Sequence, residues 1–441
     1  MKFFYALIII FFFSNCSFDN KTGIWNNENS VSKKEDSLFE EFKTLSSFNK
    51  SFDQEIYLKK DFKFKLTNSI NNSEWNDIFY DKTNNLKNLK YNQINKKIFK
   101  SRRLTKHQIN NYILFKENHL ITSDQKGNII VFSINEDKII SKFNFYKKKD
   151  KKIEKILNII IENNVIYVSD NIGYLYAFDF NKNKILWAKN YKIPFRSNLK
   201  LSGNKLIASN QNNNLYFFDK NSGEILKLIP TEETSVKNLF INNLSLNKNS
   251  LFFLNTYGSL YSVDTATMRL NWFVNLNQSL DINPSNLFFG SQIINSKDSI
   301  VISSNDFTYI IDSNTGSILH KKNFFSQVKP IIYDEYIFLI TKKNLLIAMN
   351  LISGEILYSH DINVQIAEFL NIKKKKVQIK NMMLINNNFF IFLKNSYFLI
   401  FNINGKLDIV NKLPSKILSE PIVIDGSILY LNNKNKLIVL D

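Results

Sequence analysis

The sequence predicts an all-β protein: an eight-bladed β-propeller of four-stranded antiparallel blades, closed by an N-terminal strand that joins the last blade. Three observations lead to this prediction. A short pattern returns eight times along the chain, its internal offsets stay fixed, and its last copy lacks one strand. Each of these is a property of the residues alone.

The repeat is an apolar strand that ends in Asp, Asn or Ser, followed by a turn and a second apolar strand. Leu215 to Asp219 with Glu224 to Leu228 is a clear copy. The eight strand-ending residues are Ser133, Asp179, Asp219, Asp264, Asp312, Asn350, Asn402 and Asp441. They are about 44 residues apart, which is the spacing of propeller blades. A sandwich of ordinary hairpins is the alternative, but it has no reason to keep one offset along the whole chain.

The offsets within the repeat mark a tight turn and a packing position. Glycine stands four residues after the strand end in three copies, and Asn183 takes that place in another, because both residues tolerate the left-handed conformation of a turn. A bulky residue stands eight residues after the strand end at Trp187, Trp272, His320 and Tyr358. We interpret this position, His320 included, as blade packing.

The last copy supplies Pro421 to Ile424, Ile428 to Leu431 and Leu437 to Asp441, which makes three strands. A ring with a three-stranded blade would leave an open sheet edge, unless a segment from before the first copy pairs there. Gln93 to Lys100, whose apolar members are Ile94, Ile98 and Phe99, is predicted to be that strand.

The region before the ring divides into three expected parts: a signal peptide at residues 1–15, a lipid-anchored polar tether at 16–60 and a lead-in segment at 61–92. The propeller then occupies 93–441. A helix needs about 20 apolar residues to cross a bilayer, and the apolar run Phe3 to Phe13 is shorter, as in a signal peptide. Ser14-Asn15-Cys16 resembles a bacterial lipobox, so Cys16 is the expected site of lipidation. A plain secretory signal is the alternative.

Cys16 is the only cysteine, which excludes a disulfide framework and a cysteine-rich zinc site. The net charge of +19 accompanies an abundance of Lys, Asn, Ile and Phe, and we attribute it first to compositional bias. A basic body is nevertheless attracted to anionic lipid surfaces and acidic partners. The basic runs Lys147 to Lys152 and Lys373 to Lys376 fall between repeats and are expected in solvated loops, so nucleic-acid binding is not predicted.

No residues form a recognisable catalytic, metal-binding or cofactor-binding motif. The four histidines are widely separated, and neither a glycine-rich phosphate loop nor a nucleophile elbow occurs. The strand-ending aspartates precede turns, where Asp accepts backbone hydrogen bonds, and are expected to be structural.

Leu175 to Asp179 with Ile185-Leu186-Trp187, and Leu260 to Asp264 with Trp272, resemble the PQQ-type propeller repeat. Dehydrogenases with this repeat bind pyrroloquinoline quinone and pair adjacent cysteines with a calcium site. The chain has no such cysteines, so the resemblance is not extended to a cofactor and none is expected.

A lipoprotein signal joined to one eight-bladed propeller of this type resembles the BamB family, accessory lipoproteins of the machinery that inserts β-barrels into the bacterial outer membrane. Asn72 to Trp75 is similar to a segment ahead of the propeller in alphaproteobacterial members. The resemblance implies a non-catalytic monomer within a hetero-complex on the periplasmic face of the outer membrane. Its loops would dock onto the central barrel-forming subunit. A separate hypothesis, which rests on the fold alone, is that exposed blade edges guide incoming strands by β-augmentation.

The family contact loop, with an apolar residue and Arg, resembles Phe195-Arg196-Ser197. Phe195 and Arg196 are therefore candidate partner-binding residues, and Asp281 is the candidate for a second, acidic contact loop. Two other functions stay open at this point. One is a PQQ-like quinoprotein enzyme, and the other is a propeller that binds glycans or anionic polymers.

Overall fold

The computed structural model describes residues 17–18, 25–26, 52–234, 241–277, 288–304 and 307–441. The chain divides into two compact units, Met1–Ser51 and Phe52–Asp441. In the first unit, β1 (Ser17–Phe18) pairs with β2 (Trp25–Asn26) in antiparallel register. The expected signal peptide and Cys16 lie outside the described residues. Among the residues that are described, no helix is both long and apolar enough to cross a membrane.

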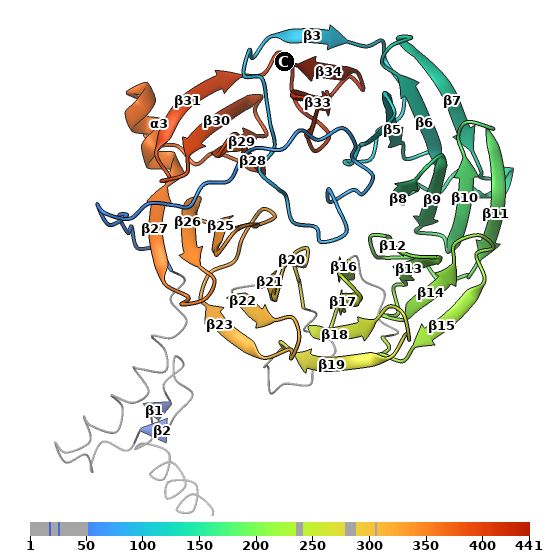
Figure 1. Ribbon diagram of the computed structural model, residues 1–441, viewed down its shortest axis with the longest axis horizontal. Coiled ribbons are helices and arrows are strands. Elements are labelled where there is room, and N and C mark those ends of the chain that lie inside the picture. The colour runs from blue at the N-terminus through green and yellow to red at the C-terminus, as the bar shows by residue number, and fades with distance from the viewer. Residues whose placement is uncertain (1–16, 19–24, 27–51, 235–240, 278–287, 305–306) are drawn as a thin grey trace, which may run out of the picture. The chain divides into compact units, whose positions relative to one another are not determined.

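The second unit is a ring of eight four-stranded antiparallel sheets, which confirms the predicted fold (Figure 1). Blades one to four consist of β4 (Leu114–Lys116), β5 (His119–Ser123), β6 (Asn128–Ser133) and β7 (Lys138–Asn144); β8 (Leu157–Glu162), β9 (Val165–Asp170), β10 (Tyr174–Asp179) and β11 (Lys184–Asn190); β12 (Lys200–Ser202), β13 (Lys205–Ser209), β14 (Leu215–Asp219) and β15 (Ile225–Ile229); and β16 (Asn243–Asn247), β17 (Ser250–Leu254), β18 (Ser259–Asp264) and β19 (Leu270–Asn275).

Blades five to eight consist of β20 (Ile294–Ser296), β21 (Ser299–Ser304), β22 (Phe307–Asp312) and β23 (Ile318–Lys322); β24 (Ile331–Tyr333), β25 (Tyr336–Ile340), β26 (Leu345–Asn350) and β27 (Ile356–Asp361); β28 (Ile379–Ile385), β29 (Asn388–Leu393), β30 (Tyr397–Asn402) and β31 (Leu407–Lys412); and β32 (Ile422–Ile424), β33 (Ser427–Leu431), β34 (Leu437–Leu440) and β3 (Lys97–Lys100). The third strands of blades one to seven end at the predicted residues, and β34 ends one residue before Asp441.

The last blade draws on both ends of this unit. β3 pairs antiparallel with β34, with Lys97 opposite Leu440 and Lys100 opposite Ile438. Ser101 extends the contact, because its backbone N–H donates to the carbonyl of Leu437 at 3.0 Å. The strand lies within the predicted range Gln93 to Lys100 and is shorter than that range.

Every blade has a β-bulge between its third and fourth strands, at the same place in the repeat. In blade two, Trp187 pairs with Ala177 and Ile185 pairs with Phe178, so Leu186 is the extra residue. A bulge redirects the side chains that follow it. Trp187 is consequently turned towards blade three, where its indole N–H donates to the carbonyl of Lys220 at 2.9 Å.

The same contact joins other neighbouring blades. Trp272 donates to the carbonyl of Ser313 at 3.0 Å and Tyr358 to that of Ile403 at 3.1 Å, while a ring nitrogen of His320 lies 2.9 Å from the carbonyl of Ile352. The packing role predicted for these residues is confirmed. We call each contact a blade staple, meaning the bulky residue of one blade held against the turn of the next.

The glycine of the repeat is the second half of the staple. Gly316 has a φ of +77°, and a Cβ atom at this position would lie 2.6 Å from the Trp272 ring. Gly223 meets Trp187 in the same way, with a φ of +75° and 2.5 Å. Both the left-handed backbone and the close approach therefore require glycine here.

One helix interrupts the repeat between blades six and seven. α3 (Ile362–Leu370) begins after Asp361, whose side chain accepts hydrogen bonds from the backbone N–H groups of Asn363 and Val364, and ends at the left-handed residue Asn371. Ile362 and Ile366, one turn apart, are its buried apolar residues. The helix occupies the region where the spacing of the predicted repeat is widest. A single 3-10 turn, η1 (Lys148–Asp150), lies between blades one and two.

The chain before β3 belongs to the ring structurally. Phe52 donates a backbone hydrogen bond to Asn323 at 3.1 Å, and Ile56 bridges to Ser359, although both residues fall in the expected tether. Residues 72–92, which we call the axial segment, then cross the middle of the ring (Figure 1).

The axial segment contacts the innermost part of every blade, in the order of the blades around the ring. The hydrogen-bonded pairs, from blade one to blade eight, are Trp75 with Phe115, Asn76 with Ile161, Asp77 with Lys200, Lys82 with Leu246, Asn84 with Ile293, Asn85 with Ile332, Leu89 with Leu384 and Asn92 with Gly426. The centre of the propeller is thus filled by its own chain.

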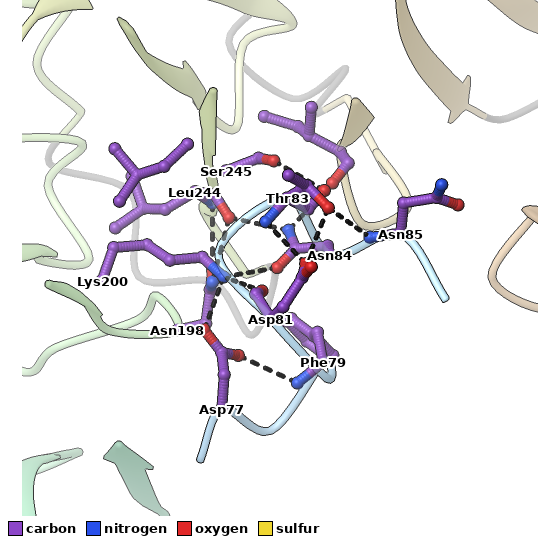
Figure 2. A network of polar contacts seen from close by, with 12 residues as sticks. Asp77, Phe79, Asp81, Thr83, Asn84, Asn85, Asn198, Lys200, Leu244 and Ser245 are labelled. Atoms are coloured by element: carbon purple, nitrogen blue, oxygen red, sulfur yellow. Dashed lines mark hydrogen bonds and ion pairs between the residues drawn. The ribbon is translucent and has the colours of Figure 1, made fainter. Parts of the chain in front are cut away.

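A buried lysine from blade three lies at the centre of the polar contacts that the axial segment makes (Figure 2). Lys200, which has no solvent-exposed surface, places its ammonium 2.6 Å from Asp77 Oδ2, 2.5 Å from Asn84 Oδ1 and 3.0 Å from the carbonyl of Asp81. An ammonium has three N–H donors, and here each has an acceptor. A lysine can be fully buried here because all of its donors have acceptors and its charge is paired with a carboxylate.

Candidate functional site

The strand directions divide the ring's connections between two faces. In each four-stranded antiparallel blade, the turns between the second and third strands and the connections to the next blade lie on one face, which we call the loop face. The remaining turns lie on the opposite face, which we call the turn face. The long connections, including α3 and the segment 191–199, belong to the loop face.

Phe195 and Arg196 lie on the loop face, between β11 and β12. Phe195 is only 2% exposed and packs its ring against Phe218 and Tyr191, so its side chain is part of the core. Its backbone N–H donates to the carbonyl of Asp170 at 2.9 Å. In this structure Phe195 fixes the loop rather than presenting a surface for a partner.

Arg196 is partly exposed. Its backbone N–H donates to Ser209 at 3.0 Å and its carbonyl accepts from Asn242 at 2.8 Å, so it bridges blades three and four. Its Nε is buried and finds no hydrogen-bond partner among the described residues. Burial lowers the pKa of the guanidinium. Asp281, the other predicted contact, lies outside the described residues.

Basic side chains gather on the loop face. Those that are exposed are Arg102, Arg103, Lys106, Lys126, Lys147, Lys148, Lys151, Lys152, Lys192, Lys342, Lys343, Lys373, Lys374, Lys375, Lys376, Lys394, Lys416 and Lys434. In the described part of this face, the exposed acidic side chains are Asp53, Glu154, Glu232, Glu233 and Glu368, and Asp53 pairs with Lys343. The two basic runs predicted to lie in loops do lie there. This face therefore has an excess of positive charge that favours acidic partners.

Apolar side chains accompany both basic runs. Ile153 and Ile156 are 46% and 50% exposed beside the first run, and Phe369 and Ile372 are 50% and 53% exposed beside the second. Exposed apolar groups that lie close together and are rimmed by polar residues are typical of surfaces that bind other macromolecules.

The strand-ending aspartates serve the turn face as predicted. Asp219 and Asp312 each accept backbone hydrogen bonds from residues two and three positions later, at 2.8 to 2.9 Å. Asp264 accepts from the backbone and side chain of Thr267 at 2.6 and 2.8 Å, and these bonds lower the pKa of its carboxyl group. These carboxylates shape turns and do not converge on a site.

A cavity of about 160 Å³, which we call the axial pocket, lies where the loop face meets the axial segment. Its apolar wall includes Trp75 and Phe79 of the axial segment and Met382 and Met383 of β28. Its polar groups come from the approaches to the first strands of four blades and from β28, and they are Tyr112, Gln292, Gln327, Lys329, Lys380, Asn381 and Glu420.

The charges of the axial pocket are two ammonium groups and one carboxylate. Lys380 Nζ lies 3.6 Å from Glu420 Oε1, and Asn381 Nδ2 donates to Glu420 Oε2 at 2.5 Å. Lys329 donates to the carbonyl of Phe79 at 2.9 Å. Burial lowers the pKa of Lys329 to about 8, and it raises the pKa values of Glu420 and Tyr112. Sequence inspection missed this site because its residues come from different copies of the repeat.

The residues present do not fit the metal site of a quinone-dependent dehydrogenase. Among the residues the structure describes, no three His, Cys, Asp or Glu side chains are placed to hold a metal ion. The adjacent cysteine pair is missing as well, since Cys16 is the only cysteine. No catalytic step is therefore derived through a quinone or calcium.

Comparison with known families matches residues 125–360 to the family described as outer membrane protein assembly factor BamB. No curated protein matches the chain. Among solved structures, BamB from Moraxella catarrhalis is similar at 15% identity over 78% of this chain and 99% of that one, with a TM-score of 0.60.

Other structures of similar shape have different origins. The quinohemoprotein alcohol dehydrogenase from Comamonas testosteroni is 9% identical, covering 84% of this chain and 81% of its own, with a TM-score of 0.63. The computationally designed Ika8 protein is 12% identical, covering 78% and 99%, with a TM-score of 0.58. At these identities the structural likeness supports the fold alone.

Proposed function

The chain belongs to the family of the outer membrane protein assembly factor BamB, and from that premise we propose that it is a non-catalytic scaffold of the outer-membrane β-barrel assembly machinery. It binds the central barrel-forming subunit through the loop face. The observation that carries this proposal is the partly exposed Arg196, whose buried Nε has no hydrogen-bond partner among the described residues.

The chemistry of Arg196 suits an acidic contact. A guanidinium binds a carboxylate through two parallel hydrogen bonds, and Arg196 would offer them from its terminal N–H groups because its Nε is buried. The buried ring of Phe195 and the backbone bonds to Ser209 and Asn242 hold the arginine in place. A fixed arginine loses less side-chain entropy on binding, which is common among residues that dominate an interface.

Co-purification of the central subunit with an Arg196→Glu variant tests the proposal. We expect at least a tenfold loss of binding, the size typical of a dominant interface residue. Lys192→Glu is the matched control, because it makes the same charge change at an exposed residue of the same loop and should leave binding nearly intact. Equal recovery of the partner with wild type and a folded Arg196→Glu variant would show that the anchor is wrong.

The lipid anchor is a second part of the proposal. Acylation of Cys16 would hold the propeller at the periplasmic face of the outer membrane, as a monomer within the hetero-complex. A Cys16→Ser variant should fractionate with soluble periplasmic proteins, whereas wild type should sediment with membranes and incorporate labelled palmitate. A Cys16→Ser variant that stays on the membrane in a strain without the barrel subunit would contradict the anchor.

Two other functions compete with the scaffold. The PQQ-type repeat keeps a quinoprotein enzyme as the first alternative, and the absorbance spectrum after incubation with pyrroloquinoline quinone and Ca²⁺ would test it. The basic loop face favours a propeller that binds glycans or anionic polymers. Salt-sensitive binding to such a polymer, with no protein recovered after cross-linking in membranes, would place this function above the scaffold.

A further inference from the structure

We propose that the axial pocket is a binding site for a carboxylate group, with Lys329 and Lys380 as its cationic partners and Glu420 as the residue that limits its affinity. This site does not depend on which protein docks on the loop face. It adds a ligand chemistry at the centre of the ring to the surface contacts described above.

The first argument is the imbalance of charge. Lys380 is engaged by the single carboxylate of the pocket, Glu420, whose other oxygen already accepts from Asn381. Among the described residues, no carboxylate lies within ion-pair distance of Lys329, which donates to the backbone carbonyl of Phe79. An ammonium with two donors unused in a partly buried site is incompletely compensated, and an added carboxylate would supply the missing acceptor.

The second argument concerns the acidic groups beyond the pocket wall, because they could have neutralised Lys329. Asp77 is bound to Lys200 at 2.6 Å. Asp81 accepts from the backbone N–H and the hydroxyl of Thr83 at 2.8 and 2.6 Å. Both carboxylates act on Lys329 only from a distance, so neither occupies its donors.

The third argument is how β28 presents its polar groups. Ile379 pairs with Leu393 and Asn381 with Phe392, which leaves Lys380 as the extra residue of a bulge. In a regular strand, consecutive side chains point to opposite faces. The bulge instead lets Lys380 and Asn381 both reach Glu420, and bulges of this kind often re-aim side chains beside binding sites.

The fourth argument is access and size. The side chains of Lys380 and Glu420 are 13% and 27% exposed, so solvent reaches the pocket. The pocket has a volume of about 160 Å³, several times the roughly 30 Å³ that one water occupies in the liquid. This volume is enough for a carboxylate with one or two carbons. The apolar wall of Trp75 and Met383 suits the carbon end of such a group.

The methionines provide a direct probe. The chain has five methionines, and of the four that the structure describes, Met382 and Met383 line the pocket. In the full-length protein labelled with ¹³C-methyl methionine, titration with sodium acetate at constant ionic strength should shift the methyl signal of Met382 or Met383 saturably. Met268 and Met349 are the internal controls, and acetamide is the neutral ligand control.

Three variants determine whether the pocket is responsible. Lys329→Gln should weaken acetate binding about tenfold, the effect of losing one charge-assisted hydrogen bond. Glu420→Gln should strengthen binding, a gain that unfolding cannot mimic. Lys394→Gln, an exposed lysine of the same face outside the pocket, should leave the affinity unchanged.

Two blocked tripeptides distinguish the source of the carboxylate. Gly-Asp-Gly blocked at both ends offers a side-chain carboxylate, and Gly-Gly-Gly blocked only at its amine offers a chain terminus. Binding of either peptide identifies a peptide carboxylate, and binding of acetate alone identifies a small free acid. Shifts that never saturate, that acetamide reproduces, or that Lys329→Gln leaves unaltered would overturn the proposal.

Discussion

The rim and the axis of this propeller are held together by different means. At the rim, a blade staple recurs between neighbours, as in Trp187 with the turn at Gly223 and Trp272 with the turn at Gly316. At the axis, one segment contacts all eight blades, and each blade is held by different residues of that segment. A repeated contact tolerates the loss of one copy, whereas a unique one has no substitute.

The comparison predicts that single changes at the axis cost more than single changes at the rim. Lys200→Met should lower the free energy of unfolding by about 3–5 kcal/mol, because it leaves Asp77 buried without a counter-charge. Chemical denaturation measures the loss. Lys184→Met, at an exposed position of β11, is the control and should change stability by less than about 0.5 kcal/mol.

A double variant separates charge from packing in the same experiment. Lys200→Met combined with Asp77→Asn removes the unpaired carboxylate and should recover part of the lost stability. If the double variant is no more stable than Lys200→Met alone, the buried charge is not the cause and the contrast between axis and rim is weakened.

At the rim, Gly316→Ala should cost about 2–3 kcal/mol, since alanine meets both an unfavourable backbone and the Trp272 ring. Gly203→Ala is the matched control. Gly203 has a φ of +60° but nothing lies within 4 Å of an added Cβ, so only the backbone cost of about 1 kcal/mol applies. Equal losses in the two variants would mean that the staple contributes no packing.

The hydrogen bond of the staple has a smaller expected effect. Trp272→Phe removes the donor to the carbonyl of Ser313 and should cost about 1 kcal/mol. Combined with Gly316→Ala, it should cost less than the sum of the two single changes, because a smaller ring relieves the clash. Additive losses would show that the two residues do not act as a pair.

The smallest expected effect is the pH dependence of the turns. Hydrogen bonds from Thr315 lower the pKa of Asp312 below its ordinary value of 3.8, so its contribution is complete above that value and is lost as the pH falls through the lowered pKa. Asp312→Asn keeps an acceptor that does not titrate. The stability difference between wild type and this variant should therefore shrink on acidification from pH 5 to pH 3, and a constant difference would contradict the assignment.

Repetition explains what the sequence could reveal. The strand ends, the turn glycines and the bulky position recur, so the fold and the packing role of His320 could be predicted from offsets alone. The axial segment has no second copy for comparison, and its polar residues resemble those of a tether. The one local sign that something polar fills the axis is Lys200, a lysine in the inner strand of blade three, where the neighbouring residues are apolar.

The candidate site was predictable only in part, for the same reason. Arg196 could be chosen because it sits in one short motif, but the burial of Phe195 depends on Phe218, which packs against it from the third strand of blade three. The axial pocket joins residues as distant as Tyr112 and Glu420. The sequence does not predict the helix α3, because it has less than three full turns and only two buried apolar residues, Ile362 and Ile366.

The bulge in the outer hairpin of each blade bears on how extended polypeptides meet this ring. A bulge bends and twists the border strand, and exposed lysines such as Lys142 and Lys227 lie along these borders. Such an edge strand is a poor template for pairing with a strand of another chain. Incoming strands would accordingly bind more readily to the charged loop face than to the outer strands of the blades. For the same reason, neighbouring rings would not readily pair edge to edge into fibres.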